Sequence, residues 1–419
     1  MPTQVLDVRP IAPTSPPPPS TARHRAGFWI VAFTLVVAMA FSTAPTPLWA
    51  LYRQRDHFST TMVTVAFAAY AVGVVVSLFL AGHVSDWLGR RRVLLPAVLL
   101  EVVAALVFLL SPDLPGLVLA RVVTGFGIGM ITATATAHLG ELHAVARPDD
   151  PPLRAGLVAT AANLGGLAVG PLVAGVLAQY VDGKLTVPYL LFLVLLVGSA
   201  VGLALVPETV RGAAPGHPYR PQRVAVPATD RIRYFAVAGA AFGLFAILGL
   251  FTSLAPSFLA ALGQSSPALA GLAAFGVFGA ATVAQLVLGR MAPARQLGIG
   301  IPATALGVTV LAAGVLLSSP GGFLLGGLVA GGGAGVLLKG SLGTAALLAP
   351  RHARAEAVAG VFLTAYVGLA LPVLGLGFAS RLGVPLASSL VGFAGLVLAV
   401  MAVVAATLRR HPARPARPG

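Results

Sequence analysis

The sequence Gly-His-Val-Ser-Asp-Trp-Leu-Gly-Arg-Arg-Arg at residues 82–92 interrupts two long apolar stretches of the chain. It places an acid, Asp86, and a turn residue, Gly89, ahead of three consecutive arginines. The apolar stretches on either side, residues 60–84 and 93–111, can each cross a bilayer core about 30 Å thick, which needs roughly 20 helical residues. The interruption is therefore typical of a short polar loop between two membrane helices.

Apolar stretches of this length recur along the whole chain. The predicted spans are residues 27–51, 60–84, 93–111, 115–137, 155–180, 187–206, 235–262, 267–289, 297–318, 321–348, 355–380 and 384–408. Backbone groups in lipid must bond internally, and barrel strands would be shorter and alternate in polarity, so we expect helices. With 57% hydrophobic and 9% charged residues, the chain has too little polar surface for a water-soluble globule. The sequence predicts an all-α integral membrane protein with twelve transmembrane helices.

The cations are divided unequally between the two sides of these spans. Of 27 lysines and arginines, four fall on one side and two lie within spans, whereas all others fall on the opposite side. The four are Arg53, Arg55, Lys184 and Arg381. Because positive residues stay cytoplasmic, we expect both termini in the cytoplasm and a multi-pass protein of the cell inner (plasma) membrane. Cations at helix ends also explain the net charge of +15 without any nucleic-acid partner.

Proline and charge mark the segments outside the spans. Residues 1–26 hold a proline run but no apolar signal core, and we expect a disordered cytoplasmic tail there. Residues 207–234, rich in proline and arginine, are typical of a solvated cytoplasmic linker, and residues 409–419 form a second tail. The linker separates an N-terminal six-helix bundle, residues 27–206, from a C-terminal one, residues 235–408. The absence of cysteine excludes disulfides, thiolate metal sites and cysteine nucleophiles.

The two bundles look like copies of one unit. The glycines 125, 127 and 129 of the fourth span recur, shifted by 206 residues, at positions 331, 333 and 335 of the tenth. At this shift Arg121 aligns with Gly327, so the arginine is absent from the second copy. Repetition of this kind predicts two pseudo-symmetric halves.

Twelve spans, two parallel halves, a basic central linker and the opening motif together resemble the major facilitator superfamily over nearly the whole chain. The loop is similar to the family signature Gly-x-x-x-Asp-x-x-Gly-Arg-Arg/Lys, matched by Gly82, Asp86, Gly89, Arg90 and Arg91. The resemblance implies that Asp86 and Arg90 latch the two halves together at a cytoplasmic gate in the outward-facing state. The alternative is a topogenic cation cluster with a helix-ending glycine.

Three further elements resemble motifs of the same family. Glu208, in a Pro-Glu-Thr element, resembles an acid that meets basic residues of the cytoplasmic gate, although a solvated helix-terminal acid is an equal alternative. Arg121, followed by the glycine ladder, resembles a buried arginine linked to proton coupling, the alternative being an arginine that snorkels to the outer interface. The fifth span resembles the motif of the drug/proton antiporter branch, which implies export, although a packing kink would also explain it. Its matching residues are Gly166, Gly170, Pro171, Ala174 and Gly175.

Glu101 is the one acid that lies well inside a predicted span. Counted along the helices, its depth differs from that of Arg121 by a gap that a long arginine side chain can largely bridge. We therefore expect Glu101 and Arg121 to form a buried pair whose protonation responds to transport. Pairing of Glu101 with Arg92 or with a polar group of a neighbouring helix is the alternative.

The resemblance implies that spans one, four, seven and ten line the cavity, and their only deep charges are Arg121 and Lys339. The positive field of these residues favours neutral or anionic cargo. The first span also lacks an acid that could bind a lipophilic cation. The candidate substrate contacts are Tyr70, Asn163, Gln285, Lys339 and Tyr366. The alternative is that these residues form hydrogen bonds between packed helices and do not contact substrate. Lys339 could instead lie near the cytoplasmic lipid interface.

Other classes of protein fit less well. His138, Glu141 and His143 approach a metalloprotease pattern, but no second histidine follows the first at the required four-residue spacing. No phosphate-binding loop for an ATP-driven pump is present either, and a non-transporting receptor is a remaining alternative. We expect no enzyme activity, cofactor or metal.

These patterns predict a monomeric secondary transporter that works by alternating access, with a small-molecule substrate, protons and the lipid bilayer as its partners. Proton-coupled export of a small neutral or anionic organic compound is the leading interpretation. Symport or facilitated passage of a small polar metabolite, a sugar or organic acid, is the alternative.

Overall fold

The computed structural model describes residues 21–82, 84–210, 219, 221–228 and 230–412. Within these ranges the chain is helical and contains no strand. Twelve helical segments in the described part of the chain are long and apolar enough to cross a membrane. The prediction of an all-α, twelve-span membrane protein is therefore confirmed.

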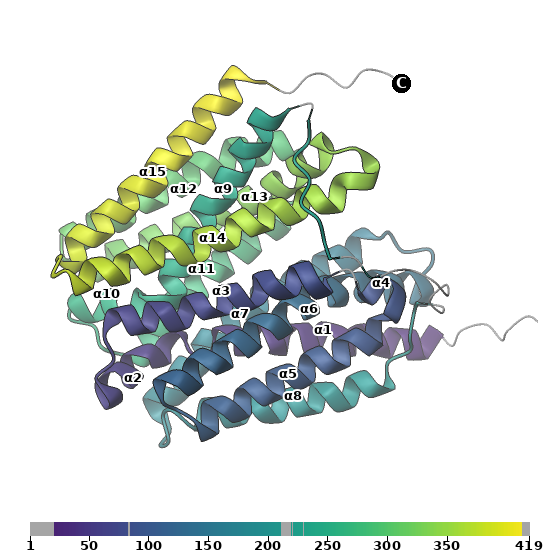
Figure 1. Ribbon diagram of the computed structural model, residues 1–419, viewed down its shortest axis with the longest axis horizontal. Helices are drawn as coiled ribbons and strands as arrows, with labels where there is room; N and C mark the ends of the chain where they lie inside the picture. Colours follow the sequence, from purple (N-terminus) through teal and green to yellow (C-terminus); the bar gives the residue numbers. More distant parts are fainter. Residues whose placement is uncertain (1–20, 83, 211–218, 220, 229, 413–419) are drawn as a thin grey trace, which may run out of the picture.

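The first half of the chain supplies six of these segments (Figure 1). Its helices are α1 (Thr21–Thr43), η1 (Thr46–Leu48), α2 (Trp49–Asp56), α3 (Thr60–Ala81), α4 (Ser85–Leu88), α5 (Arg90–Leu110), α6 (Leu114–Ala146), α7 (Leu153–Tyr180) and α8 (Val187–Leu205). The first crossing joins α1, η1 and α2, and it bends at Pro45, which lies directly before η1 and leaves a helical backbone bond unmade.

The second half supplies the other six segments. Its helices are α9 (Arg231–Ser253), α10 (Ala255–Ala261), α11 (Pro267–Leu288), α12 (Pro293–Leu316), α13 (Pro320–Leu348), η2 (Arg351–Ala353), α14 (Arg354–Arg381) and α15 (Leu386–Arg410). The side chains of Ser266 and Ser319 accept hydrogen bonds from backbone N–H groups in the first turns of α11 and α13. These caps fix where the two helices begin.

Several helix ends lie beyond the predicted spans. Residues 21–26, predicted within a disordered tail, are helical, and residues 231–234 and 409–410 also extend their helices. The Asp230 side chain accepts a hydrogen bond from the backbone N–H of Arg233 and caps α9, so this helix begins inside the predicted linker. Hydropathy detects the lipid-facing part of a helix but not the polar turns that continue it. The rest of the predicted tails, residues 1–20 and 413–419, lies outside the described residues.

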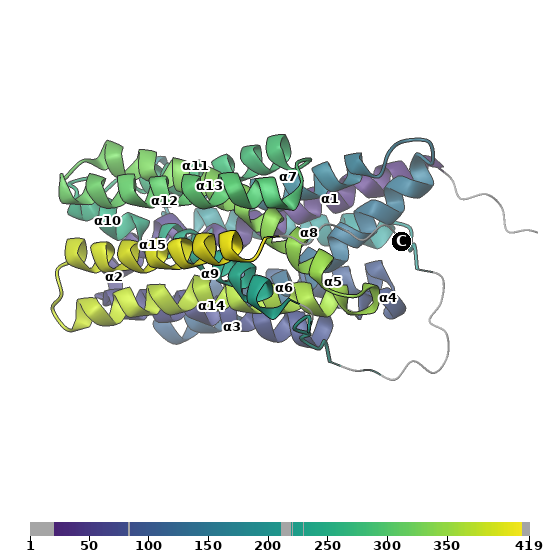
Figure 2. The same cartoon turned by 90° about the horizontal axis from the view of Figure 1, so that it is seen from above.

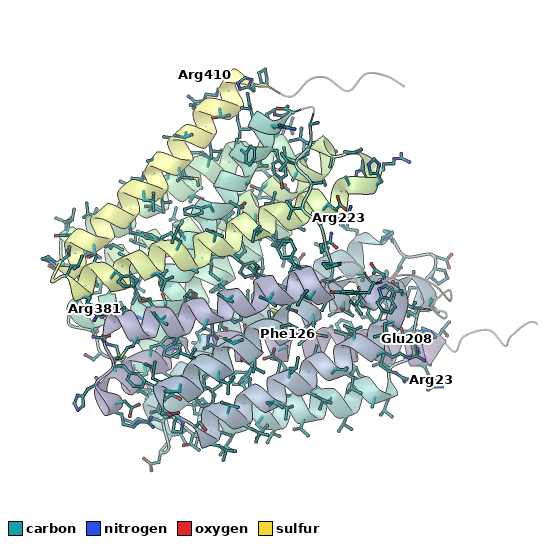
Figure 3. The ribbon with its side chains drawn as sticks, in the orientation of Figure 1. Arg23, Phe126, Glu208, Arg223, Arg381 and Arg410 are labelled. Carbon is teal, nitrogen blue, oxygen red and sulfur yellow. The ribbon has the colours of Figure 1, made fainter. Side chains whose placement is uncertain are left out.

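The helices gather into two groups that correspond to the two halves of the sequence (Figure 1). Helices α3 and α7 of the first half pack against α14 and α11 of the second. We call the end with α2 and α10 the α2 end and the end with α4 the α4 end. The two groups diverge toward the α4 end, and Figure 2 shows that all long helices run between the two ends. Glu208 lies at the α4 end and Arg381 at the α2 end (Figure 3).

The two halves repeat the same glycine contacts. A Cβ on Gly125 would collide with the backbone of α3, and a Cβ on Gly331 with the backbone of α11. A Cβ on Gly127 would meet Glu101 of α5, whereas one on Gly333 would meet Thr304 of α12. Because the second, third and fourth crossings pack like the eighth, ninth and tenth, the recurrence of the glycines is a recurrence of helix contacts.

Candidate transport site

A cavity of about 480 Å³ lies between the two halves. Helices α1, α2, α3, α6 and α7 and the short η1 line it from the first half, and α9, α11, α13 and α14 from the second. Its size falls within the range of about 300–1,000 Å³ that is usual for sites of small organic molecules. The polar residues of its lining are Ser42, Thr43, Thr46, Tyr70, Arg121, Thr132, Thr136, Thr160, Asn163, Thr252, Gln285, Lys339 and Tyr366.

The cavity runs from a closed floor toward the α4 end. Pro45 and Trp49 line its floor, whereas Thr136 and Leu153 line the part nearest the α4 end. Hydrogen bonds join the halves beyond the floor. Arg53 donates to Ser257 Oγ at 2.9 Å, Thr61 to the Gly377 carbonyl at 2.7 Å, and Ser266 to the Gln179 side chain at 3.1 Å. The structure is thus a conformation closed at the α2 end.

Arg121 points into the deep part of this cavity from α6. Its side chain donates to the Ser42 carbonyl of α1 at 2.6 Å, and the residue is only 3% exposed. The guanidinium carbon lies 4.3 Å from the ring centroid of Tyr70 and 5.8 Å from that of Phe67. Aromatic faces stabilise a cation in a dry site, so Arg121 is held inside the bundle and does not snorkel to the interface.

Glu101 lies between α5 and α6, fully buried against Gly127. Neither carboxyl oxygen has a hydrogen-bond partner within the described ranges. The predicted ion pair with Arg121 is not formed, and neither is the alternative pair with Arg92. Arg121 and Gly127 lie on different faces of α6, so the guanidinium turns toward the cavity and Ser42 while Glu101 packs on the side away from it.

The predicted gate residues lie together at the α4 end. Arg90 donates to Asp86 and to Ser85 Oγ, the latter at 2.8 Å, while the Arg90 and Arg91 backbone N–H groups donate to Glu208 at 2.8 and 3.1 Å. Glu208 therefore caps the first turn of α5, where the helix dipole favours a negative charge. The alternative, that Glu208 is a solvated acid at a helix end without a partner, is therefore wrong. We call Ser85, Asp86, Arg90, Glu141 and Glu208 the Arg90 cluster.

Two glycines shape the backbone at this cluster. Gly89 has a φ of 115°, which is unfavourable for other residues, and a Cβ there would collide with the Glu208 carboxylate. Gly82 follows the last helical residue of α3. Each bond of the cluster joins residues of the first half, so the predicted latch between the halves stays a prediction for the outward-facing state.

Glu141 is a charged member of the Arg90 cluster that the sequence motifs do not indicate. It accepts from Arg90 at 2.8 Å and from the Thr209 hydroxyl, whereas in the sequence it stands out only in the incomplete metalloprotease pattern with His138 and His143. His138 instead lies 3.2 Å from the Pro207 carbonyl, and no group of three metal-ligating side chains occurs in the described part of the chain. The available signal was an acid at the end of a span that faces the same side as the arginine triplet.

Replacing Arg90 by alanine is expected to lower the free energy of unfolding by about 1–3 kcal/mol, because Glu141 and Asp86 lose a charge-assisted partner. The measurement is the melting temperature of the purified protein in detergent. Arg92→Ala, which removes an exposed arginine of the same triplet, is the matched control and should melt like the parent. Equal melting of the two variants would contradict the role given to Arg90.

The glycine motif of α7 contacts two helices. A Cβ on Gly166 or Gly170 would collide with the backbone of α1, and one on Gly175 with the backbone of α11 in the other half. The Thr43 hydroxyl also donates to the Leu167 carbonyl at 3.0 Å. Pro171, which lies inside α7, directs its carbonyl toward Gly271. The motif thus brings α7 into backbone contact with both α1 and α11.

The five candidate substrate contacts all line the cavity. Gln285 also donates to the Gly335 carbonyl at 3.2 Å, which is a packing contact, and the ring of Tyr366 packs edge-on against Phe245. Lys339 lies beside Gly289 at the end of α11. The sequence did not indicate the apolar rings of the lining, because helices that are apolar on every face give no sign of which face is turned inward. These rings are Trp49, Phe67, Phe245, Phe278 and Phe362.

The model of the Major Facilitator Superfamily matches residues 31–371, and the chain belongs to this superfamily of transporters. A stretch of 83 residues is 35% identical to the arabinose-proton symporter of Bacillus subtilis (strain 168), covering 20% of this chain and 18% of the symporter. A stretch of 141 residues is 31% identical to an uncharacterized MFS-type transporter of Mycobacterium tuberculosis (strain ATCC 25618 / H37Rv), covering 32% of this chain and 20% of that protein. The matches thus span a fifth or less of these relatives.

Solved structures match over almost the full length. The human organic anion transporter MFSD10 (TETRAN) superposes with a TM-score of 0.65 at 16% identity, covering 93% of this chain and all of that one. A peptide transporter POT in complex with sulfate superposes with a TM-score of 0.75 at 14% identity, covering 92% of this chain and 94% of that one. At such identities the likeness establishes the fold, and the chain is a multi-pass membrane protein with the fold of transporters.

Proposed function

We propose that the protein is a secondary active transporter that exports a small neutral or anionic organic compound in exchange for protons. The observation that carries this proposal is the cavity between two similar halves, closed at the α2 end and lined by Arg121 near its floor. A single site that two halves enclose from alternate sides is the basis of alternating access. In this proposal the bundles of residues 27–206 and 235–408 are the two bodies that rock, and the monomer is the working unit.

The α4 end carries most of the positive charge and is the cytoplasmic end in this proposal. In this orientation the protein lies in the cell inner membrane with both termini in the cytoplasm. The described conformation is then inward-facing. Asp86 and Arg90 would close the cytoplasmic side in the other conformation. The α7 motif, in backbone contact with α1 and α11, supports placement in the drug/proton antiporter branch.

Arg121 and Glu101 are the proposed proton-coupling residues. Both lie at α6: Arg121 extends from this helix into the cavity, and Glu101 of α5 packs against the helix at Gly127. A buried carboxyl without a partner is unfavourable as an anion and holds its proton until a change in helix packing admits water or a cation. In this proposal, the rocking of the halves supplies that change.

Transport across a proton gradient tests the function. Proteoliposomes with an imposed pH gradient are screened with a weak organic acid, a neutral sugar and a lipophilic cation. We expect gradient-dependent movement of the acid or of the neutral compound. Robust movement of the cation alone would contradict the charge argument, and movement of no solute would contradict a transporter.

Sugar or organic-acid symport is a second candidate, and the match to the arabinose-proton symporter favours it. The direction of coupling separates the two. An exporter moves its substrate against the proton flux, whereas a symporter accumulates it on the side to which protons flow.

Replacing Glu101 by glutamine is expected to abolish the dependence of transport on the pH gradient while exchange of substrate at equal pH persists. Glutamine keeps the size of the side chain but cannot carry a proton. Glu356→Gln, which alters a glutamate at the first turn of α14, is the matched control. Unchanged pH dependence in Glu101→Gln would exclude this residue from coupling.

A further inference from the structure

The charged side chains that line the cavity within the described ranges are cations. Within the described ranges neither aspartate nor glutamate lines it, whereas Arg121 and Lys339 both do. Neither of these cations forms an ion pair in the described part of the chain. The cavity therefore holds two positive charges that no protein carboxylate neutralises.

The two cations occupy different depths. Arg121 lies near the closed floor, beside Ser42, and its buried Nε has no hydrogen-bond partner among the described residues. Lys339 is half-buried beside Gly289, the residue at which α11 ends near the α4 end. An anion that enters from the α4 end meets the lysine first and then reaches an arginine with an unused donor.

Aromatic rings fill much of the wall between these charges. Trp49, Phe67 and Tyr70 line the cavity from the first half, and four more rings line it from the second. Those four are Phe245, Phe278, Phe362 and Tyr366. A substrate with a flat apolar body would bury that body here and contact the rings. A sugar carries hydroxyl groups on every side and would lose their hydration against these rings.

From this arrangement we propose that the substrate is an amphipathic organic anion with one acidic group and an aromatic body, and that Lys339 selects for its charge. This inference rests on the proposed function, because it names the substrate class of the same cavity. The acidic group lies in the field of Lys339 and Arg121, and the body packs against the rings. Two positive charges that line the same cavity repel a cation of the same shape.

A matched set of ligands tests the charge. Naphthalenesulfonate is a permanent anion, naphthylmethyl trimethylammonium a permanent cation and naphthalenemethanol neutral, so pH changes the charge of none of them. Equilibrium dialysis with the purified protein at low salt measures their affinities. We expect the anion to bind at least about tenfold more tightly than the cation.

The chain offers a matched pair of variants, because Lys339 and Lys184 are its two lysines. Lys184 is exposed in the loop between α7 and α8. We expect Lys339→Gln to weaken naphthalenesulfonate binding about tenfold and to leave naphthalenemethanol binding unchanged, whereas Lys184→Gln changes neither.

Chemical protection gives a readout that needs no variant. An amine-reactive reagent is applied to the parent protein with and without naphthalenesulfonate, and mass spectrometry measures modification at each lysine. The anion should protect Lys339 and leave Lys184 unprotected. Equal modification of Lys339 in both samples would overturn its role.

The failures are distinguishable. If the cation binds as tightly as the anion, or if no naphthyl compound binds, the substrate class is wrong while pH-driven movement of another solute still supports a transporter. If the pH-gradient screen moves no solute, the proposed function itself is wrong.

Discussion

Replacement of Arg121 by alanine is expected to reduce pH-gradient-driven transport to the level of protein-free liposomes. The guanidinium joins α6 to the Ser42 carbonyl of α1 and contacts the rings of Tyr70 and Phe67. Alanine removes the deepest charge of the cavity and leaves the Ser42 carbonyl without its donor. The measurement is uptake of the substrate into proteoliposomes under an imposed gradient.

Two further substitutions make the Arg121 prediction specific. Arg121→Lys keeps the charge but loses the planar guanidinium, and we expect partial activity. Arg381→Ala removes an exposed arginine at the end of α14 and should transport like the parent. Near-parental transport by Arg121→Ala would show that the arginine is a packing residue.

Replacement of Gly125 by alanine is expected to lower the free energy of unfolding by about 2–3 kcal/mol, the largest effect on stability that we predict. A Cβ at this position would collide with the Tyr70 carbonyl, and Gly73 of α3 faces the backbone of α6 in the same way. Neither backbone can yield without separating α3 from α6. Thermal unfolding in detergent measures the change.

The same helix provides the control for Gly125. A Cβ on Gly140 would meet no atom of the described residues within 4 Å. Gly140→Ala should leave stability equal or raise it by up to about 1 kcal/mol, because alanine favours the helix more than glycine does. Equal stability of Gly125→Ala and Gly140→Ala would mean that α3 and α6 do not depend on this close approach.

The number and type of the membrane segments were predictable because the cost of exposing polar groups to lipid makes every crossing a long apolar run. The position of the polar loop between α3 and α5 was predictable for a related reason. Asp86, Gly89 and Arg90 are polar or turn-forming residues at a fixed spacing between two such runs, so their positions stand out. Glu208 adds a capping role at α5 that its place after α8 alone did not reveal.

The remaining parts of the site depend on helix rotation, which the sequence does not encode locally. Depth along a helix placed Glu101 near Arg121, but the face of α6 decides whether they meet, and they do not. Glu141 was missed because its partner, Arg90, is on another helix. In water an apolar stripe would have indicated these faces, but in lipid both faces of a helix are apolar.

The crossing of α7 and α11 has a mechanical consequence. At Gly175 and Gly271 the two main chains touch, and a Cβ on either residue would meet the opposite backbone. Since no side chain separates the two main chains at this point, the proposed rocking of the halves could use this crossing as its pivot. A tilt about the pivot that widens the molecule at one end would narrow it at the other.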